Sequence, residues 1–198
     1  MACTGLTKGR GLICDRTVAG VEYNYLAVYD EFNSNADTGE IYGTGIIVST
    51  GEVTDIEMGT NDLYRYALPR GESSFTETIV GSTENGTIHY QPSISLKINQ
   101  LTKEDQNQVR LLAKTKVVAF VQLNQKLASG NHVIVGMGMR NGLNLNAGTN
   151  ISGAAWGDHG GYSWTFDGLE EDPMAMVADY TTVPFDNAAF TIGDIVIT

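Results

Sequence analysis

Hydrophobic and polar residues alternate along several short segments of the chain, which is the pattern of strands with one buried face. The clearest segment is residues 21–29, which alternates at first and then becomes apolar on both faces, as a strand does when it enters a core. Residues 53–58 also alternate, with one set on each face: Val53, Asp55 and Glu57, and then Thr54, Ile56 and Met58. This second segment is expected to bury one side and to present acidic groups on the other.

Turn-forming residues between such segments predict two hairpins. The first joins residues 45–48 to residues 53–58 through Ser-Thr-Gly-Glu. The second joins residues 75–80 to residues 87–99 through Asn85-Gly86, and Asn-Gly supplies the positive φ angles of a type I′ turn.

Pro92 lies inside the second arm of that hairpin and cannot donate a ladder hydrogen bond. We therefore expect this arm to be an edge strand or to bulge at the proline.

One helix is predicted over about residues 102–116. Thr102 is its N-cap, and Asp105 takes the capping-box position, where Glu or Gln is more usual. The apolar residues follow helical spacing in a single narrow stripe, so the helix is expected to cover a sheet face.

Further strand-like segments occur around the helix: residues 63–68, 117–123, 133–139, 161–166, 174–178 and 190–197. Residues 30–40 form a polar loop between the first strand and the first hairpin. Ten to twelve short strands and one helix predict a mainly β fold, a β-sandwich or flattened barrel with one flanking α-helix. With no long linker and no internal repeat, we expect one domain over residues 1–198, of which residues 1–20 form an N-terminal arm.

Charge is segregated along the sequence, although the total is only −11. Residues 17–64 contain nine acids and no Lys or Arg, residues 65–140 contain nine basic residues and five acids, and residues 141–198 contain eight acids and no basic residue. This distribution argues against a reader of duplex DNA, which needs a basic face to displace counterions. Solubility of a free subunit is a sufficient explanation of the negative charge on its own.

The candidate chemical motifs are incomplete. The glycines of residues 136–142 have the spacing GxGxxxG and no following helix, so a strand and tight turn are favoured over a phosphate loop. Residues 33–39 lack the glycine position and the bidentate Glu of a calcium loop. Asp158-His159 is expected in a solvated turn, because a hydrolase would need a nucleophile elbow that is absent. The acids of residues 170–172 are expected in a solvated loop.

Cys3 and Cys14 are expected to be free thiols, since two thiols without nearby His make an incomplete zinc site. No apolar leader or membrane-spanning stretch is visible, so we expect synthesis in a cytoplasm and no membrane partner. We expect no catalytic residue, no metal and no cofactor, and therefore no enzyme.

The second half of the chain resembles the C-terminal half of phage tail-tube proteins. The motifs that carry the resemblance follow the helix and strand of residues 101–123: VIVGMGMRNGL at 133–143, ISG at 151–153 and DHGGYSWTFDGLE at 158–170. The opening of the chain, residues 7–29, is similar to theirs as well, with a turn at Asp15-Arg16 between two strands. Residues 30–95 carry no such motif.

The resemblance implies a β-sandwich that assembles into hexameric rings. These rings stack into a hollow tail tube on the virion, through which genomic DNA passes without specific binding. Partners would be further copies of the chain and other tail proteins: an initiator or baseplate, a terminator and, in a contractile tail, a sheath. The subunits would assemble in the host cytoplasm. The resemblance carries over no catalytic site and no cofactor.

An acidic wall would repel phosphate and so favour passage of DNA. Our candidates for lumen-facing acids are Asp55, Glu57 and Asp62. Our candidates for basic residues that meet acidic surface on a neighbouring subunit are Arg65, Arg70 and Lys97.

Two alternatives remain open. One is another virion β-protein, such as a decoration protein, a fibre domain or a carbohydrate-binding module. A module of this last kind would gather exposed aromatics in a groove, and the candidates are Tyr23, Tyr25, Tyr29, Tyr42, Tyr64 and Tyr66. The other is an enzyme that uses Asp158, His159 and the acidic run.

Overall fold

The computed structural model describes residues 9–10, 18–30, 46–47, 51–187 and 190–197. The expected features at Cys3, Cys14 and Tyr42, most of the N-terminal arm and the loop of residues 31–40 lie outside these residues. The strands of the first half are β1 Val21–Val28, β2 Ile46–Ile47, β3 Glu52–Val53, β4 Ile56–Glu57, β5 Leu63–Ala67, β6 Ser74–Ser82 and β7 Thr87–Asn99. Helix α2 Lys103–Leu112 is followed by β8 Val117–Lys126, β9 His132–Met137, β10 Asn144–Ile151, β11 Gly161–Asp167, β12 Ala175–Val177, β13 Phe190–Thr191 and β14 Ile195–Val196.

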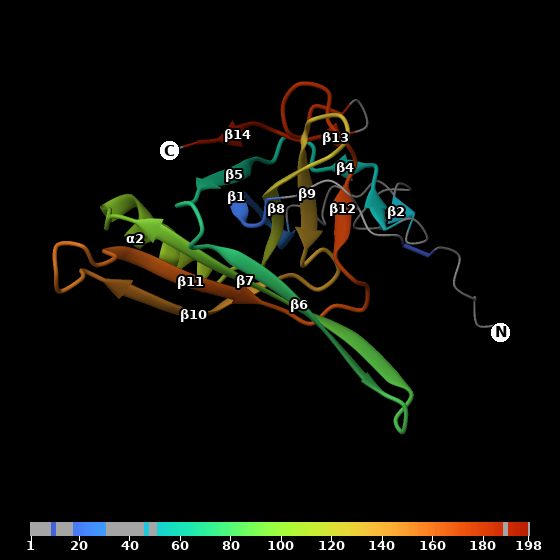
Figure 1. Ribbon diagram of the computed structural model, residues 1–198, viewed down its shortest axis with the longest axis horizontal. Coiled ribbons are helices and arrows are strands. Elements are labelled where there is room, and N and C mark those ends of the chain that lie inside the picture. Colours follow the sequence, from blue (N-terminus) through green and yellow to red (C-terminus); the bar gives the residue numbers. More distant parts are fainter. Residues whose placement is uncertain (1–8, 11–17, 31–45, 48–50, 188–189, 198) are drawn as a thin grey trace.

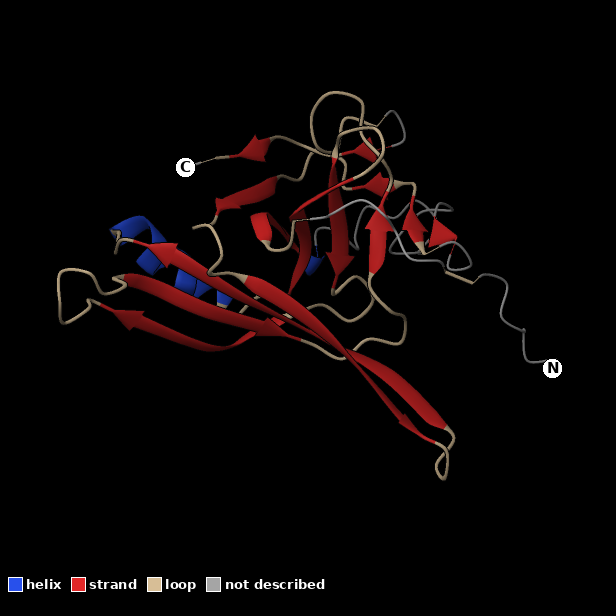
Figure 2. Ribbon diagram, in the orientation of Figure 1, coloured by secondary structure: helices blue, strands red, loops and turns tan. Residues whose placement is uncertain are grey.

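Two large sheets face each other across a hydrophobic core (Figure 1). The first has eight strands in the order β14-β5-β1-β8-β9-β12-β3-β2, and the second has four, β10-β11-β7-β6. The predicted fold class is confirmed: the described chain is mainly β, with sheets in a sandwich and one helix (Figure 2). No helix among the described residues is long and apolar enough to cross a membrane.

The central strands of the eight-stranded sheet are buried on both faces. Along β8, Val117, Ala119 and Val121 enter the core that it shares with the four-stranded sheet. Val118 and Phe120 point the opposite way, into a second core. That second core is closed by the short parallel pair of β4 and β13 and by Phe185, whose ring packs edge-on against Phe120 with centroids 5.4 Å apart. The molecule therefore has three layers.

Helix α2 has the predicted cap. The Thr102 hydroxyl accepts the Asp105 N–H at 3.0 Å, which satisfies one of the free donors of the first turn. The helix ends at Leu112 and not near residue 116, because Lys114 N–H bonds to the Leu111 carbonyl and tightens the last turn. Val109 and Leu112 pack against the first core, so the helix covers one end of the sandwich.

The strand expected over residues 53–58 is interrupted, which is a correction. Val53 stays in the eight-stranded sheet, but the chain leaves it at Thr54-Asp55, and β4 pairs with β13. Because of this break Val53 and Ile56 are both buried, so Val53 does not share the face of Asp55 and Glu57. The strand expected over residues 190–197 is likewise split into β13 and β14.

Both details predicted for the second hairpin are wrong. Its turn is a four-residue loop, residues 83–86, closed by the Ser82–Thr87 pair, and only Gly86 has a positive φ, of 63°. This is a longer hairpin connection than a type I′ turn.

Pro92 lies in β7, an inner strand, opposite Glu77 and without a register shift. The continuous ladder between β7 and β11 ends at Ser93, so Pro92 lies just beyond it. The Pro92 carbonyl still accepts the Gly168 N–H at 3.2 Å.

Candidate assembly surfaces

Within the described residues, the four-stranded sheet has two open edges, β10 on one side and β6 on the other. Strand β10, with the sequence NLNAGTNI, has no charge and no proline, and β6 has a single charge, Glu77. Edge strands of soluble monomers usually carry charges, prolines or covers that prevent pairing with another chain. These two edges have few such features and are long enough to template a strand of another subunit.

Strand β10 was not predicted. Residues 144–151 are polar and Asn-rich and show no apolar alternation, so the sequence gives no sign of a strand there. All but Leu145 are exposed, so this strand is defined by its pairing with β11 and not by burial.

The hydrogen bonds fix which groups face the open edges. In β7, the Tyr90 N–H and carbonyl bond to Glu170, and the Pro92 carbonyl bonds to Gly168, so even-numbered groups point toward β11. Successive residues of an antiparallel strand point their backbone groups to opposite sides. Through the registers of the sheet, this alternation directs the N–H groups of Gly148 and Asn150 in β10, and of Glu77 and Ile79 in β6, to the open edges.

The outer face of this sheet carries mostly small, polar side chains. Strand β11 turns Tyr162, Trp164 and Phe166 into the first core, so its intervening residues face outward. With their cross-strand partners they form what we call the polar face: Ser74, Thr76, Thr78, Gln91, Ser93, Ser95, Lys97, Asn99, Asn144, Ala147, Thr149, Ile151, Gly161, Ser163, Thr165 and Asp167. This face holds one basic and one acidic residue, and most of its other side chains are hydroxyls and amides.

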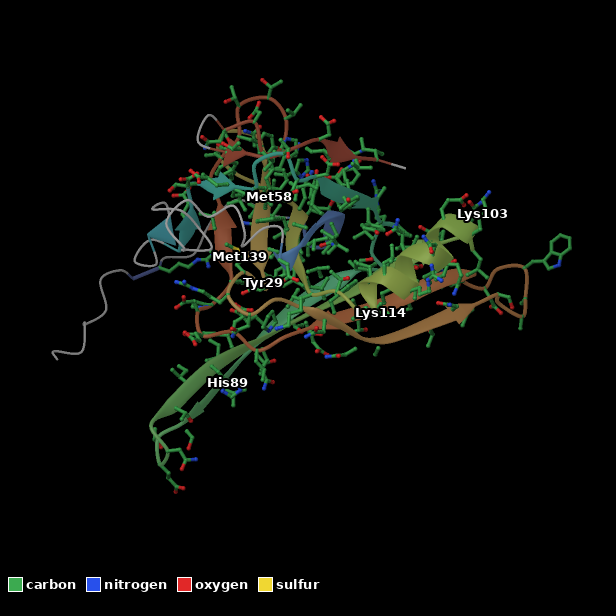
Figure 3. The ribbon with its side chains drawn as sticks, turned by 180° about the vertical axis from the view of Figure 1, so that it is seen from behind. Tyr29, Met58, His89, Lys103, Lys114 and Met139 are labelled. Carbon is green, nitrogen blue, oxygen red and sulfur yellow. The ribbon has the colours of Figure 1, made fainter. Side chains whose placement is uncertain are left out.

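Strands β6 and β7 continue past the rest of the sheet as a projecting hairpin (Figure 1). The side of this hairpin that continues the core-facing side of the sheet carries Ile79, Gly81, Ile88 and Tyr90. Nothing of the described chain covers its end, where Ile79 is 65% exposed and Ile88 is 61% exposed. The opposite side carries mostly polar residues together with Val80, and His89 lies on it near Gln91 (Figure 3). The projecting hairpin is therefore amphipathic, with an uncovered apolar side.

A buried carboxylate holds the root of the hairpin, which corrects the expectation of a solvated acidic loop. Glu170 is only 5% exposed. Its two carboxylate oxygens accept the backbone N–H groups of Arg140 and Asn141, at 2.9 and 3.0 Å. Its own N–H and carbonyl bond to Tyr90 in β7. Burial raises the pKa of Glu170, while these two N–H groups and the Arg140 charge lower it.

The neighbouring acids reinforce this attachment. Asp172 forms an ion pair with Arg140, with 3.0 Å between Oδ2 and Nε. Glu77 of β6 accepts the Met174 N–H at 2.7 Å. Only Glu171, which is exposed, fits the solvated loop that the sequence predicts.

The candidate lumen acids lie away from the polar face. Asp55 and Glu57 are half-exposed beside β4, in the layer beyond the second core, and the eight-stranded sheet separates them from the four-stranded sheet (Figure 1). Asp62 accepts the Asp194 N–H at 2.8 Å and so fixes the connection between β13 and β14. The structure brings these acids together on one side of the molecule.

The candidate basic residues differ in their surroundings. Arg65 is half-buried, with its guanidinium carbon 4.8 Å from the centre of the Tyr23 ring. Lys97 lies on the polar face and pairs with Glu72 at 3.6 Å. Arg70 is exposed on the connection between β5 and β6. Two of the three thus already have contacts within the subunit.

The remaining candidate motifs have structural roles. Gly138 and Gly142 have φ angles of 72° and 78° in the turn after β9, as a strand and tight turn require. Asp158 is exposed in a turn and accepts the N–H groups of Ala154 and Ala155, which lower its pKa. His159 is half-buried, with Nε2 enclosed. Within the described residues no three His, Cys, Asp or Glu side chains are grouped as metal ligands.

The described tyrosines do not gather in an exposed groove. Tyr25 is buried, and burial raises its pKa to about 12. Tyr23 and Tyr29 pack against the second core, and Tyr66 packs against the first. Tyr64 alone of these five counts as exposed.

No protein-family model, curated protein sequence or solved structure matches the chain. The edges, the polar face and the hairpin are therefore the basis for a functional proposal.

Proposed function

We propose that this chain is a structural subunit of a phage tail tube, which assembles into rings that stack into a conduit for DNA. The observation that carries the proposal is the four-stranded sheet, whose two open edges are formed by two different strands, β10 and β6. Pairing of β10 with β6 of the next copy is a heterologous contact, and such contacts close into a ring when the rotation permits. The ring of six copies follows the resemblance in the sequence.

A sheet closed in this way has no edge and leaves one face toward the channel. We assign the polar face to the channel, because hydroxyl and amide side chains hold no array of positive charge for phosphate. Lys97, its one basic residue, is paired with Glu72. The apolar face of each sheet stays covered by its own eight-stranded sheet. In this arrangement Asp55, Glu57 and Asp62 lie on the outer side of the ring.

The uncovered side of the projecting hairpin supports contacts between subunits as well, because an exposed apolar surface marks an interaction site. The remaining partners are those of the family resembled: other tail proteins at the two ends of the tube, in a virion tail assembled in the host cytoplasm. No described feature favours a carbohydrate-binding module, since the tyrosines do not form a groove.

Negative-stain microscopy of the purified chain over a range of concentrations tests the proposed function. We expect hollow tubes of uniform width above a threshold concentration, or on addition of a tail initiator complex. Particles that remain monomers or small closed oligomers under all these conditions would refute a tail-tube subunit.

The location of the channel wall has its own test. The paired changes Ser163→Lys and Thr165→Lys add positive charge to the polar face and should slow DNA delivery about ten-fold, more at low salt, because lysines retain phosphate. The matched pair Asp55→Lys and Glu57→Lys, with the same number of added lysines, should leave delivery unchanged. The measurement is the rate of DNA release from virions that carry each variant. If only the second pair slowed DNA delivery, the channel wall would instead be the side that carries Asp55, Glu57 and Asp62.

A further inference from the structure

The loop between β10 and β11 presents a fully exposed tryptophan on a hydrogen-bonded turn. Trp156 is exposed at 108% of the reference area. The turn below it is closed by Asp158, whose carboxylate accepts the N–H groups of Ala154 and Ala155 at 2.9 and 2.7 Å. The Asp158 N–H returns a bond to the Ala155 carbonyl at 3.0 Å. The ring is therefore held out into solvent by a pre-formed loop.

Such an arrangement has an energetic consequence. An exposed indole covers little of its apolar surface, and contact with a partner would bury about 150–250 Å² per aromatic side chain. Because the loop is already ordered, little conformational entropy is lost on binding. Tryptophan is also the residue type most enriched among the side chains that dominate interface energies. Leu101 and Ile151 are also exposed at this end of the sheet.

The other end of the same sheet has a matching surface. On the apolar side of the hairpin, Gly81 lies directly opposite Ile88, with Ile79 next to it along the strand. A Cβ built at Gly81 meets nothing nearer than the Thr87 carbonyl oxygen, at 3.8 Å. The absence of a side chain leaves a flat apolar site between the two isoleucines, on which an indole ring can lie.

We propose that Trp156 of one copy packs over Gly81, between Ile79 and Ile88, of the next copy along the tube. This rests on the proposed function, and it names the partner of the uncovered hairpin face as a second copy of this chain. The two surfaces lie at opposite ends of one sheet (Figure 1), so stacking of sheets end to end brings them together. The contact is heterologous and leaves a free hairpin and a free Trp156 at the ends of the stack.

The small size of the contact agrees with a second copy of this chain as the partner. A single indole and a pair of isoleucines bury far less than the ~1,200–2,000 Å² of a stable complex, so the contact would not hold two free subunits together. Repeated around a ring, the same contact becomes multivalent and gains strength without any new interaction. The surfaces thus suit a polymer of this chain better than a separate partner protein.

Fluorescence reports on this contact directly, because the chain has two tryptophans and Trp164 is 1% exposed. In the monomer, Trp156 supplies the red-shifted, acrylamide-quenchable emission. Tubes of the wild-type chain should show a blue shift and loss of the quenchable fraction. Trp156→Ala should remove that fraction and raise the threshold concentration for tubes by about ten-fold or more.

Gly81→Val tests the other side of the contact. Gly81 lies in a regular strand with open space around it, so valine suits the monomer and fills only the site for the indole. We expect a raised threshold of similar size. Ile88→Thr, which keeps strand propensity, should act in the same direction. Thr78→Val, on the polar side of β6, is the matched control and should assemble normally; buried Trp164 emission reports that each variant is folded.

The outcomes separate the two proposals. Wild-type tubes in which Trp156 remains as quenchable as in the monomer would overturn the inference and leave the proposed function intact. The inference is also overturned, again without loss of the proposed function, if Gly81→Val forms tubes at the wild-type threshold with Trp156 protected. If the wild-type chain forms no tubes, the proposed function fails and this inference fails with it.

Discussion

Asn150→Pro is expected to leave the monomer folded and to prevent assembly at concentrations where the wild-type chain forms tubes. The registers of the sheet direct the Asn150 N–H to the open edge of β10, so proline removes no ladder bond within the subunit. At a paired edge the same change deletes a hydrogen bond and places the proline ring against the incoming strand. The cost of about 1–2 kcal/mol per interface corresponds to an increase of roughly ten-fold or more in the threshold concentration.

The neighbouring position supplies the control. Thr149 pairs with Ser163, and its N–H points to β11, inside the subunit. Thr149→Pro should therefore lower the thermal stability of the monomer, whereas Asn150→Pro should change it little. Light scattering gives the assembly threshold, and thermal denaturation gives monomer stability. Tubes from Asn150→Pro at the wild-type threshold would exclude β10 as an assembly edge.

Glu170→Ala is expected to destabilise the folded subunit by about 3 kcal/mol, because it removes a buried acceptor from two backbone N–H groups. These groups belong to Arg140 and Asn141 and have 2.9 and 3.0 Å bonds to the carboxylate. Glu171→Ala, at the adjacent exposed position, should change the free energy of unfolding by less than about 0.5 kcal/mol. Urea denaturation of the monomers measures both, and equal effects would contradict the role of Glu170.

The same carboxyl gives a pH dependence with a definite sign. Burial raises the pKa of Glu170, so the folded state binds its proton more tightly than the unfolded state does. The stability that this group contributes is present below its unfolded pKa of about 4.3 and is lost as pH rises through the folded pKa. The stability of the wild type relative to Glu170→Gln should therefore fall as pH rises across this window. A difference that rises with pH would show that the two N–H bonds outweigh burial.

The elements that could be predicted from sequence are those with one or two buried faces. Strand β11 alternates Tyr162, Trp164 and Phe166 with polar residues, and β8 is apolar on both faces because a core lies on each side. The cap of α2 at Thr102 was also predictable, since capping is a local interaction.

Features that depend on distant partners could not be predicted. Strand β10 is exposed on both sides, and only its pairing with β11 makes it a strand. Three consecutive acids favour a solvated loop, but Glu170 is buried because its partners approach from a turn 30 residues earlier in the chain. The apolar side of the projecting hairpin follows from the register that places Ile79 and Ile88 on one side. The sequence does not reveal that the other strands of the sheet end before this hairpin does. The candidate site residues were chosen by charge, whereas the surfaces suited to assembly are nearly uncharged.

The four-stranded sheet has a direction, with a projecting hairpin at one end and the Trp156 loop at the other. A filament built by adding such subunits head to tail is polar, so its two tips differ in chemistry. One tip displays apolar hairpins and the other displays indole rings. A protein that nucleates growth and a protein that arrests it would need different binding surfaces, and a decoy that mimics only one tip would block elongation from that side alone.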